Sequence, residues 1–183
     1  MTQNEIEIET LYRKHLVEFA RIFIGIKEVG GNNRGEFVSM FQKAVDGKAQ
    51  GEAWCAAAVS YWIKTSTRIL SGSLGADIAI SSPLQLSESV CNFYFNNPEK
   101  YRLSKPEVGS LILWRRWANG KPTWQGHIGI VADIVNDDVV RTIEGNTSSD
   151  GPNQRDGDGV FLKSRSITRH YGSLRPLGFM KVY

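Results

Sequence analysis

The segment GEAWCAAA, residues 51–58, decides the predicted fold because it places Cys55 at the start of a helix. An alanine-rich apolar pattern continues from it, so we expect a helix from about Trp54 to Arg68 that packs closely on another element. Free N–H groups and the positive end of the dipole at a helix start favour a thiolate, the nucleophilic form of cysteine, and can also stabilise an oxyanion. Cys55 is therefore a candidate nucleophile, although taken alone a small buried hydrophobe would fit the same pattern.

Helices are expected before and after this segment, and strands near the end of the chain. Apolar residues at helical spacing predict helices over Glu5–Glu28, Gly35–Val45 and Pro83–Phe95. Apolar and alternating runs predict strands at 110–114, 127–135, 139–144, 160–163 and 177–182. This order indicates an α+β fold, with helices packed on one face of an antiparallel sheet.

Length and composition favour one domain. The chain has 183 residues, of which 41% are hydrophobic and 22% charged, as in ordinary globular proteins. We expect a single catalytic domain over 1–183, divided into N-terminal helices (1–50), the helix that carries Cys55 (51–69), a variable insertion (70–105) and the sheet (106–183). The net charge of +3 would help the protein approach an anionic polymer but is too small to identify one.

The second candidate catalytic segment is GHIGIV, residues 126–131, in which His127 begins a strongly apolar strand. An unperturbed pKa of about 6.5 suits a histidine that accepts a thiol proton near neutral pH. The next strand, across a short turn, leads to Glu144 and Asn146. In such a hairpin the start of one strand lies near the end of the other, so either residue can reach the far nitrogen of His127. A nucleophile, a base and a third group that orients the base are the components of nucleophilic catalysis.

Three segments resemble the CHAP domains of the NlpC/P60-like superfamily, which are papain-like peptidoglycan amidases and endopeptidases. They are WCAAAVS at 54–60, GHIGIV at 126–131 and IEGNT at 143–147. The segment IKEVGGNNRG at 26–35 resembles the opening motif of a lysin-like branch, and GDGV at 157–160 and LGF at 177–179 are similar to its closing segments. The resemblance covers about residues 26–182 and implies a papain-like fold with the nucleophile at a helix N-terminus. Residues 70–105 are longer than the family leads us to expect.

The resemblance also implies roles and a reaction. Cys55 would be the nucleophile, His127 the base, Glu144 the orienting acid and Asn146 a supporting polar group. The reaction would be hydrolysis of an amide bond in the cell-wall peptide through a thioester, by an endopeptidase or an N-acetylmuramoyl-L-alanine amidase. Two alternatives stay open: an acyl-transferring or deamidating toxin with the same Cys-His pair, and an inactive cell-wall-binding module.

The expected partner is bacterial peptidoglycan rather than nucleic acid or a membrane interior, and we expect a monomer. The candidate substrate-binding residues are Trp54, Glu28, Asn32 and Trp124. Trp114 and Trp117 also lie shortly before His127, and exposed aromatic rings there could stack on sugars. We expect Trp114 to belong to the core.

We expect neither a cofactor nor a metal. Cys55 and Cys91 are predicted to be free thiols, with Cys91 a packing residue. Asp150, Asp156 and Asp158 lie in a Gly/Asn-rich stretch but lack the spacing of an EF-hand, which favours a turn over a calcium site.

The beginning of the chain predicts synthesis in the cytoplasm without a signal peptide. Residues 1–9 carry three glutamates instead of a basic segment and an apolar core. Action on the wall would then require release during phage lysis or delivery by a secretion machine.

Overall fold

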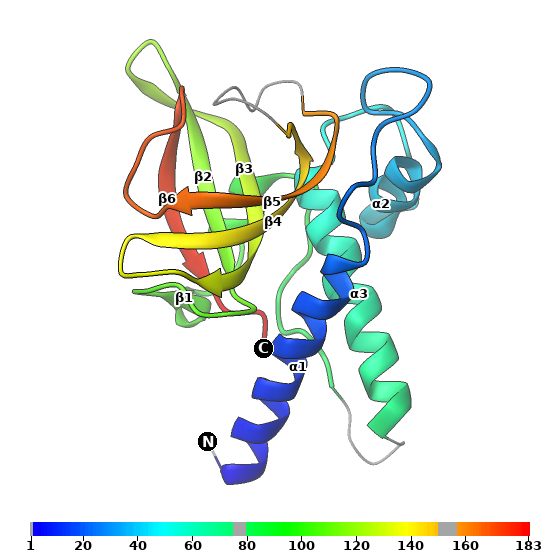
Figure 1. The fold of residues 1–183 in the computed structure, drawn as a ribbon, viewed down its shortest axis with the longest axis vertical. Helices are drawn as coiled ribbons and strands as arrows, with labels where there is room; N and C mark the ends of the chain where they lie inside the picture. The colour runs from blue at the N-terminus through cyan, green and yellow to red at the C-terminus, as the bar shows by residue number, and fades with distance from the viewer. Residues whose placement is uncertain (1, 75–79, 150–156) are drawn as a thin grey trace.

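The computed structural model describes residues 2–74, 80–149 and 157–183, and its elements form an α+β fold (Figure 1). The helices are α1 (Gln3–Arg21), α2 (Glu36–Asp46), α3 (Cys55–Leu74) and α4 (Val90–Phe95), followed by a short 3-10 turn at Glu99–Tyr101. The predicted combination of helices and an antiparallel sheet is confirmed.

One six-stranded antiparallel sheet forms the other layer, in the order β1-β6-β2-β3-β4-β5. Its strands are β1 (Arg102–Leu103), β2 (Leu111–Ala118), β3 (Lys121–Ile134), β4 (Val139–Thr147), β5 (Gly159–Ser166) and β6 (Leu174–Met180). Figure 1 shows β4 and β5 running across the direction of β2 and β6, so the sheet is strongly twisted, with α1 and α3 beside it. The twist follows from the handedness of L-residue strands.

The two faces of the sheet bury different groups of side chains. Leu111, Leu113, Ile128, Ile130 and Ile143 share a core with the helices, among them the fully buried alanines 56–58 of α3. The alternate positions Ile112, Trp114, Val131 and Val140 form a second cluster with Leu174. Since side chains alternate across a strand, neighbouring residues of β2 serve both cores.

Helix α1 is shorter than predicted. It ends at Arg21 rather than near Glu28, because the following segment pairs with the edge of β5. The N–H of Gly25 donates to the carbonyl of Val160 (2.9 Å), and the N–H of Val160 donates to the carbonyl of Ile26 (2.8 Å). Pairing with a distant strand therefore overrides the helical spacing of the apolar residues.

The helix predicted over 83–95 is reduced to α4, which begins after the N-cap Ser89. The residues before it are held by Asn97: its side-chain oxygen accepts from the N–H of Gln85 (2.7 Å), and its nitrogen donates to the carbonyls of Gln85 (3.0 Å) and Phe93 (2.7 Å). A buried side chain here supplies the hydrogen bonds that a longer helix would have provided.

Within the described ranges, none of the helices combines the length and the apolar character required to cross a bilayer.

Candidate active site

Cys55 is the first residue of α3 and is almost fully buried. The first hydrogen bond of the helix runs from the N–H of Ala58 to the carbonyl of Trp54 (2.8 Å). The N–H groups of the first turn have no carbonyl partner within their own helix, and the helix dipole adds positive potential there. The backbone thus provides donors at the position of the sulfur.

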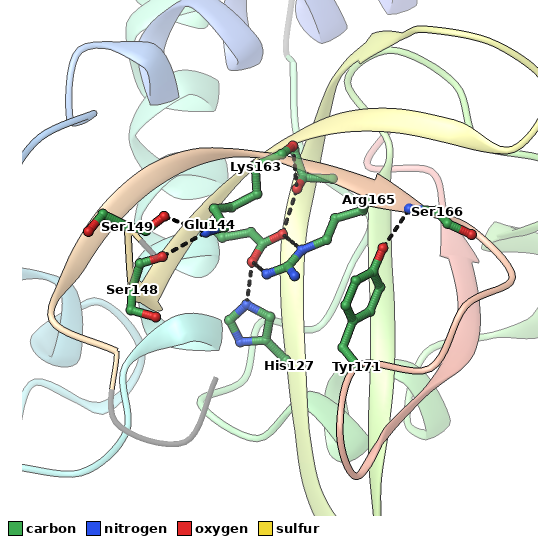
Figure 2. Close-up of polar contacts among 9 residues, drawn as sticks. His127, Glu144, Ser148, Ser149, Lys163, Arg165, Ser166 and Tyr171 are labelled. Carbon is green, nitrogen blue, oxygen red and sulfur yellow. Dashed lines mark hydrogen bonds and ion pairs between the residues drawn. The ribbon is translucent and has the colours of Figure 1, made fainter. Parts of the chain in front are cut away.

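His127 lies on β3, directly opposite Trp114 on β2. Its ring is buried and stacks on the Trp114 indole, with 5.9 Å between the ring centres and 30° between the planes. The Nε2 atom lies 2.8 Å from Oε2 of Glu144 on β4, as Figure 2 shows. The other ring nitrogen, Nδ1, is therefore the one that remains for a hydrogen bond with the Cys55 sulfur.

The surroundings of His127 favour its protonated form. Burial is the largest single effect and would lower the pKa of the imidazole, but the hydrogen bonds with Cys55 and Glu144 and the charges of both groups together outweigh it. Together these interactions raise the pKa of His127 from 6.5 to about 9. The ring is thus equipped to take a proton from the neighbouring sulfur.

Glu144 is fully buried and its carboxylate is surrounded by donors. Arg165 on β5 donates from Nε to Oε1 (2.7 Å) and from Nη2 to Oε2 (2.5 Å) (Figure 2). The hydroxyl of Thr142 also donates to Oε1 (2.5 Å). Burial raises the pKa of Glu144, but Arg165 and His127 more than reverse this and hold the pKa well below its usual range. The ionised form of Glu144 is therefore the favoured one.

Arg165 was not predicted from the sequence because the fourth predicted strand, at 160–163, ended before it. The strand reaches Ser166 and pairs Arg165 with Val140, two residues from Thr142 along β4. The available signal was the alternation of Lys163 and Arg165 on one face of a strand that follows the glutamate strand.

Asn146 does not contact the far nitrogen of His127; that position belongs to Glu144. In the orientation of its amide that satisfies both ends, Asn146 donates to the carbonyl of Gly157 (2.9 Å) and accepts from the N–H of Trp54 (3.1 Å). Its backbone adopts a φ of 52°. Asn146 thus ties the end of β4 to the residue that precedes Cys55.

A cleft of about 620 Å³ contains three of the four catalytic candidates. Cys55, His127 and Asn146 lie on its wall, together with Trp117 and Trp124 from the β2–β3 hairpin. Trp124 is 73% exposed, whereas Trp114 is buried as predicted. The other lining residues are Glu52, Ala53, Glu88, Ser89, Val90, Arg116, Ala118, Thr123, Gln125, Gly126 and Ser173.

Three of the predicted substrate-binding residues are placed elsewhere. The Trp54 ring is fully buried against Phe41, and its Nε1 donates to Glu28 (2.8 Å). The other carboxylate oxygen of Glu28 accepts from the N–H of Asn33 (2.8 Å). Asn32 is exposed, and neither it nor Glu28 lines the cleft. Trp54 and Glu28 therefore brace the start of α3 instead of facing a substrate in this conformation.

The remaining candidates concern thiols and metals. Cys91 is a buried free thiol whose sulfur faces the carbonyls of Thr123 and Gln125 at 3.8 Å, and burial raises its pKa. In the described part of the chain no three acidic, histidine or cysteine side chains are grouped as metal ligands. Asp158 pairs with Lys27 (3.3 Å), while Asp150 and Asp156 lie outside the described residues.

Comparison with known proteins identifies a family for this chain. The family model of the CHAP domain matches residues 47–146, a segment that contains Cys55, His127, Glu144 and Asn146 and ends before Arg165. No curated protein and no solved structure matches the chain. CHAP domains are usually hydrolases that act on peptidoglycan. The match covers more than half of the residues of this chain, which therefore belongs to the CHAP domain family.

Proposed function

We propose that this chain is a cysteine-dependent peptidoglycan hydrolase that cleaves an amide bond of the cell-wall peptide, with Cys55 as nucleophile and His127 as base. The observation that carries the proposal is the meeting of Cys55, at the start of α3, with His127 in one cleft, while Glu144 holds the far side of the imidazole. A nucleophile, a base and a carboxylate that orients the base are the groups that acyl transfer through a covalent intermediate requires.

The first half of the proposed reaction forms a thioester. His127 Nδ1 accepts the Cys55 proton, and the sulfur attacks the carbonyl carbon of the scissile amide. The resulting oxyanion is stabilised by backbone N–H groups at the start of α3. When the C–N bond breaks, His127 returns its proton to the leaving amine, and the acyl group stays on the sulfur.

The second half releases the acyl group. His127 removes a proton from water, the hydroxide oxygen attacks the thioester carbonyl, and the C–S bond breaks. The products are a free carboxylic acid and the regenerated Cys55–His127 pair. Glu144 keeps the ring in one orientation and stabilises the imidazolium that forms in each half.

The direct test is digestion of purified peptidoglycan followed by mass analysis of the fragments. We expect the protein to release fragments with a new amine and a new carboxylate, and Cys55→Ala to release none while its circular dichroism is unchanged. Cys91→Ala is the matched control, since Cys91 is equally buried but does not line the cleft, and should keep its activity. Full activity of Cys55→Ala would exclude the proposal.

Two further measurements separate the alternatives that share this fold. With an added amine, an acyl transferase would give amide products where a hydrolase gives mainly acids. A binding module without an active thiol would be alkylated by iodoacetamide at Cys55 no faster than at Cys91. Since the two residues are 6% and 7% exposed, we expect rapid modification of Cys55 alone to report its pairing with His127.

A further inference from the structure

The buried ion pair behind the histidine goes beyond what the proposed reaction requires. Without Arg165, the fully buried Glu144 carboxylate would keep His127 and the Thr142 hydroxyl as partners but would have no permanent positive charge beside it, which is unfavourable for a buried charge. Arg165 supplies one N–H to each carboxylate oxygen, at 2.7 and 2.5 Å, and so fixes the plane of the carboxylate (Figure 2). Such two-point pairing restricts rotation in a way that a single donor does not.

The guanidinium is itself held in place. Arg165 is 4% exposed, and its charged end lies 4.7 Å from the ring centre of Tyr171 and 5.7 Å from that of Trp114. The Tyr171 hydroxyl accepts from the N–H of Ser166 (2.6 Å), which fixes the tyrosine against β5. Trp114 also stacks on His127, so one indole contacts both ends of the His127–Glu144–Arg165 chain.

We propose that Arg165 is a positioning residue for catalysis, which acts through Glu144 by keeping its carboxylate ionised and turned toward Nε2 of His127. The proposal rests on the function proposed above. Around Glu144, the described groups that titrate or carry charge are His127 from β3, with Cys55 of α3 beyond it, and Arg165 from β5, with the Tyr171 phenol on its other side. Without Arg165, burial would favour the neutral acid, which offers His127 no negative charge.

The informative variants are Arg165→Met and Arg165→Lys. For Arg165→Met we expect kcat to fall about 10–100-fold near neutral pH, which is the range seen when an outer partner of a metal-bound histidine is removed. We also expect a new acidic limb in the pH profile, because Glu144 then takes up a proton as the pH falls. Lysine restores the positive charge but cannot donate to both carboxylate oxygens in the fixed geometry of a guanidinium. Arg165→Lys should therefore show no acidic limb and should retain more of kcat than Arg165→Met, but not all of it. Arg141→Met, on the half-exposed arginine of β4, is the matched control and should leave both unchanged.

A double-variant cycle decides whether the effect passes through Glu144. If it does, Arg165→Met adds no loss of kcat to Glu144→Gln, because the carboxylate that it positions is already gone. The double variant remains informative if Arg165→Met alone fails to fold. It removes both charges of the Glu144–Arg165 pair, so neither is left buried without its partner. A further loss in the double variant would overturn the proposal, as would a folded Arg165→Met protein with the parent's kcat and pH profile.

The rate of Cys55 alkylation by iodoacetamide, measured against pH in the same variants, separates this proposal from the proposed function. Alkylation needs no peptidoglycan. A parent protein that is alkylated rapidly but cleaves no wall would contradict the proposed substrate. The Arg165 proposal would still be supported by a new acidic limb of alkylation in Arg165→Met and overturned by its absence.

Discussion

Gly129 leaves the space that Glu144 fills: a Cβ atom at position 129 would lie 2.8 Å from Cγ of Glu144 and 3.1 Å from the carbonyl oxygen of Ile143. Neither neighbour can move freely, since the first belongs to the buried carboxylate and the second to β4. The second glycine of the Gly-His-Ile-Gly segment therefore permits the contact between Glu144 and His127, two residues earlier on β3.

We predict that Gly129→Ala lowers both stability and activity. Overpacking at a buried site costs about 1–3 kcal/mol, and displacement of Glu144 should reduce kcat as well. The measurements are urea unfolding and the rate of peptidoglycan cleavage. Gly72→Ala is the control, because Gly72 lies in exposed helix with nothing within 4 Å of its Cβ position and should be neutral or slightly stabilising. Unchanged cleavage by a stable Gly129→Ala protein would contradict this steric account.

The pH dependence of stability should report the protonated His127. Its pKa is about 9 in the folded protein and 6.5 without these contacts, so folding favours the bound proton. The stabilisation is therefore complete below about pH 6.5 and is lost as the pH rises through 9, by up to about 3 kcal/mol at 1.36 kcal/mol per pKa unit. We expect the difference in unfolding free energy between the parent and His127→Gln to shrink over this range. A difference that stayed constant from pH 6 to pH 10 would contradict the raised pKa.

Glu144 and Asn146 should differ in the kind of loss that their replacement causes. Glu144→Gln keeps the shape but removes the charge beside His127, so we expect a large fall in kcat, about 100-fold or more. Asn146→Gly removes the two amide hydrogen bonds but tolerates the positive φ, whereas Asn146→Ala also strains the backbone by about 1 kcal/mol. Kinetics and unfolding of all three variants test this division. If Glu144→Gln were fully active and Asn146→Gly inactive, the orienting role would pass to Asn146.

Trp124 should contribute to substrate binding and not to folding. It is 73% exposed on the wall of the cleft, so Trp124→Ala should change the free energy of unfolding by less than about 0.5 kcal/mol. For soluble wall fragments we expect KM to rise about 5-fold or more, which corresponds to about 1 kcal/mol. Ile22 has the same exposure but lies on no part of the cleft, so Ile22→Ala provides the comparison. Equal KM values for the two variants would remove Trp124 from the site.

Local patterns in the sequence were sufficient for the helix that begins at Cys55, for a strand that contains His127 and for the α+β order of elements, although that strand begins at Lys121 and not at His127 as predicted. These features depend on periodicity and on the character of a helix start, which a few neighbouring residues decide. The choice between Glu144 and Asn146 as partner of His127 lay beyond such patterns, because both end the same strand and only its register against β3 separates them.

Only the tertiary structure decided which residues support the catalytic side chains from outside the cleft. Arg165 reaches Glu144 because β5 pairs with β4, and α1 stops at Arg21 because the next residues pair with the edge of β5. Trp54, next to the nucleophile in sequence, is turned into the core by Phe41 and Glu28. Each of these outcomes depends on contacts between residues far apart in the chain, and the free energy of those contacts outweighs local preference.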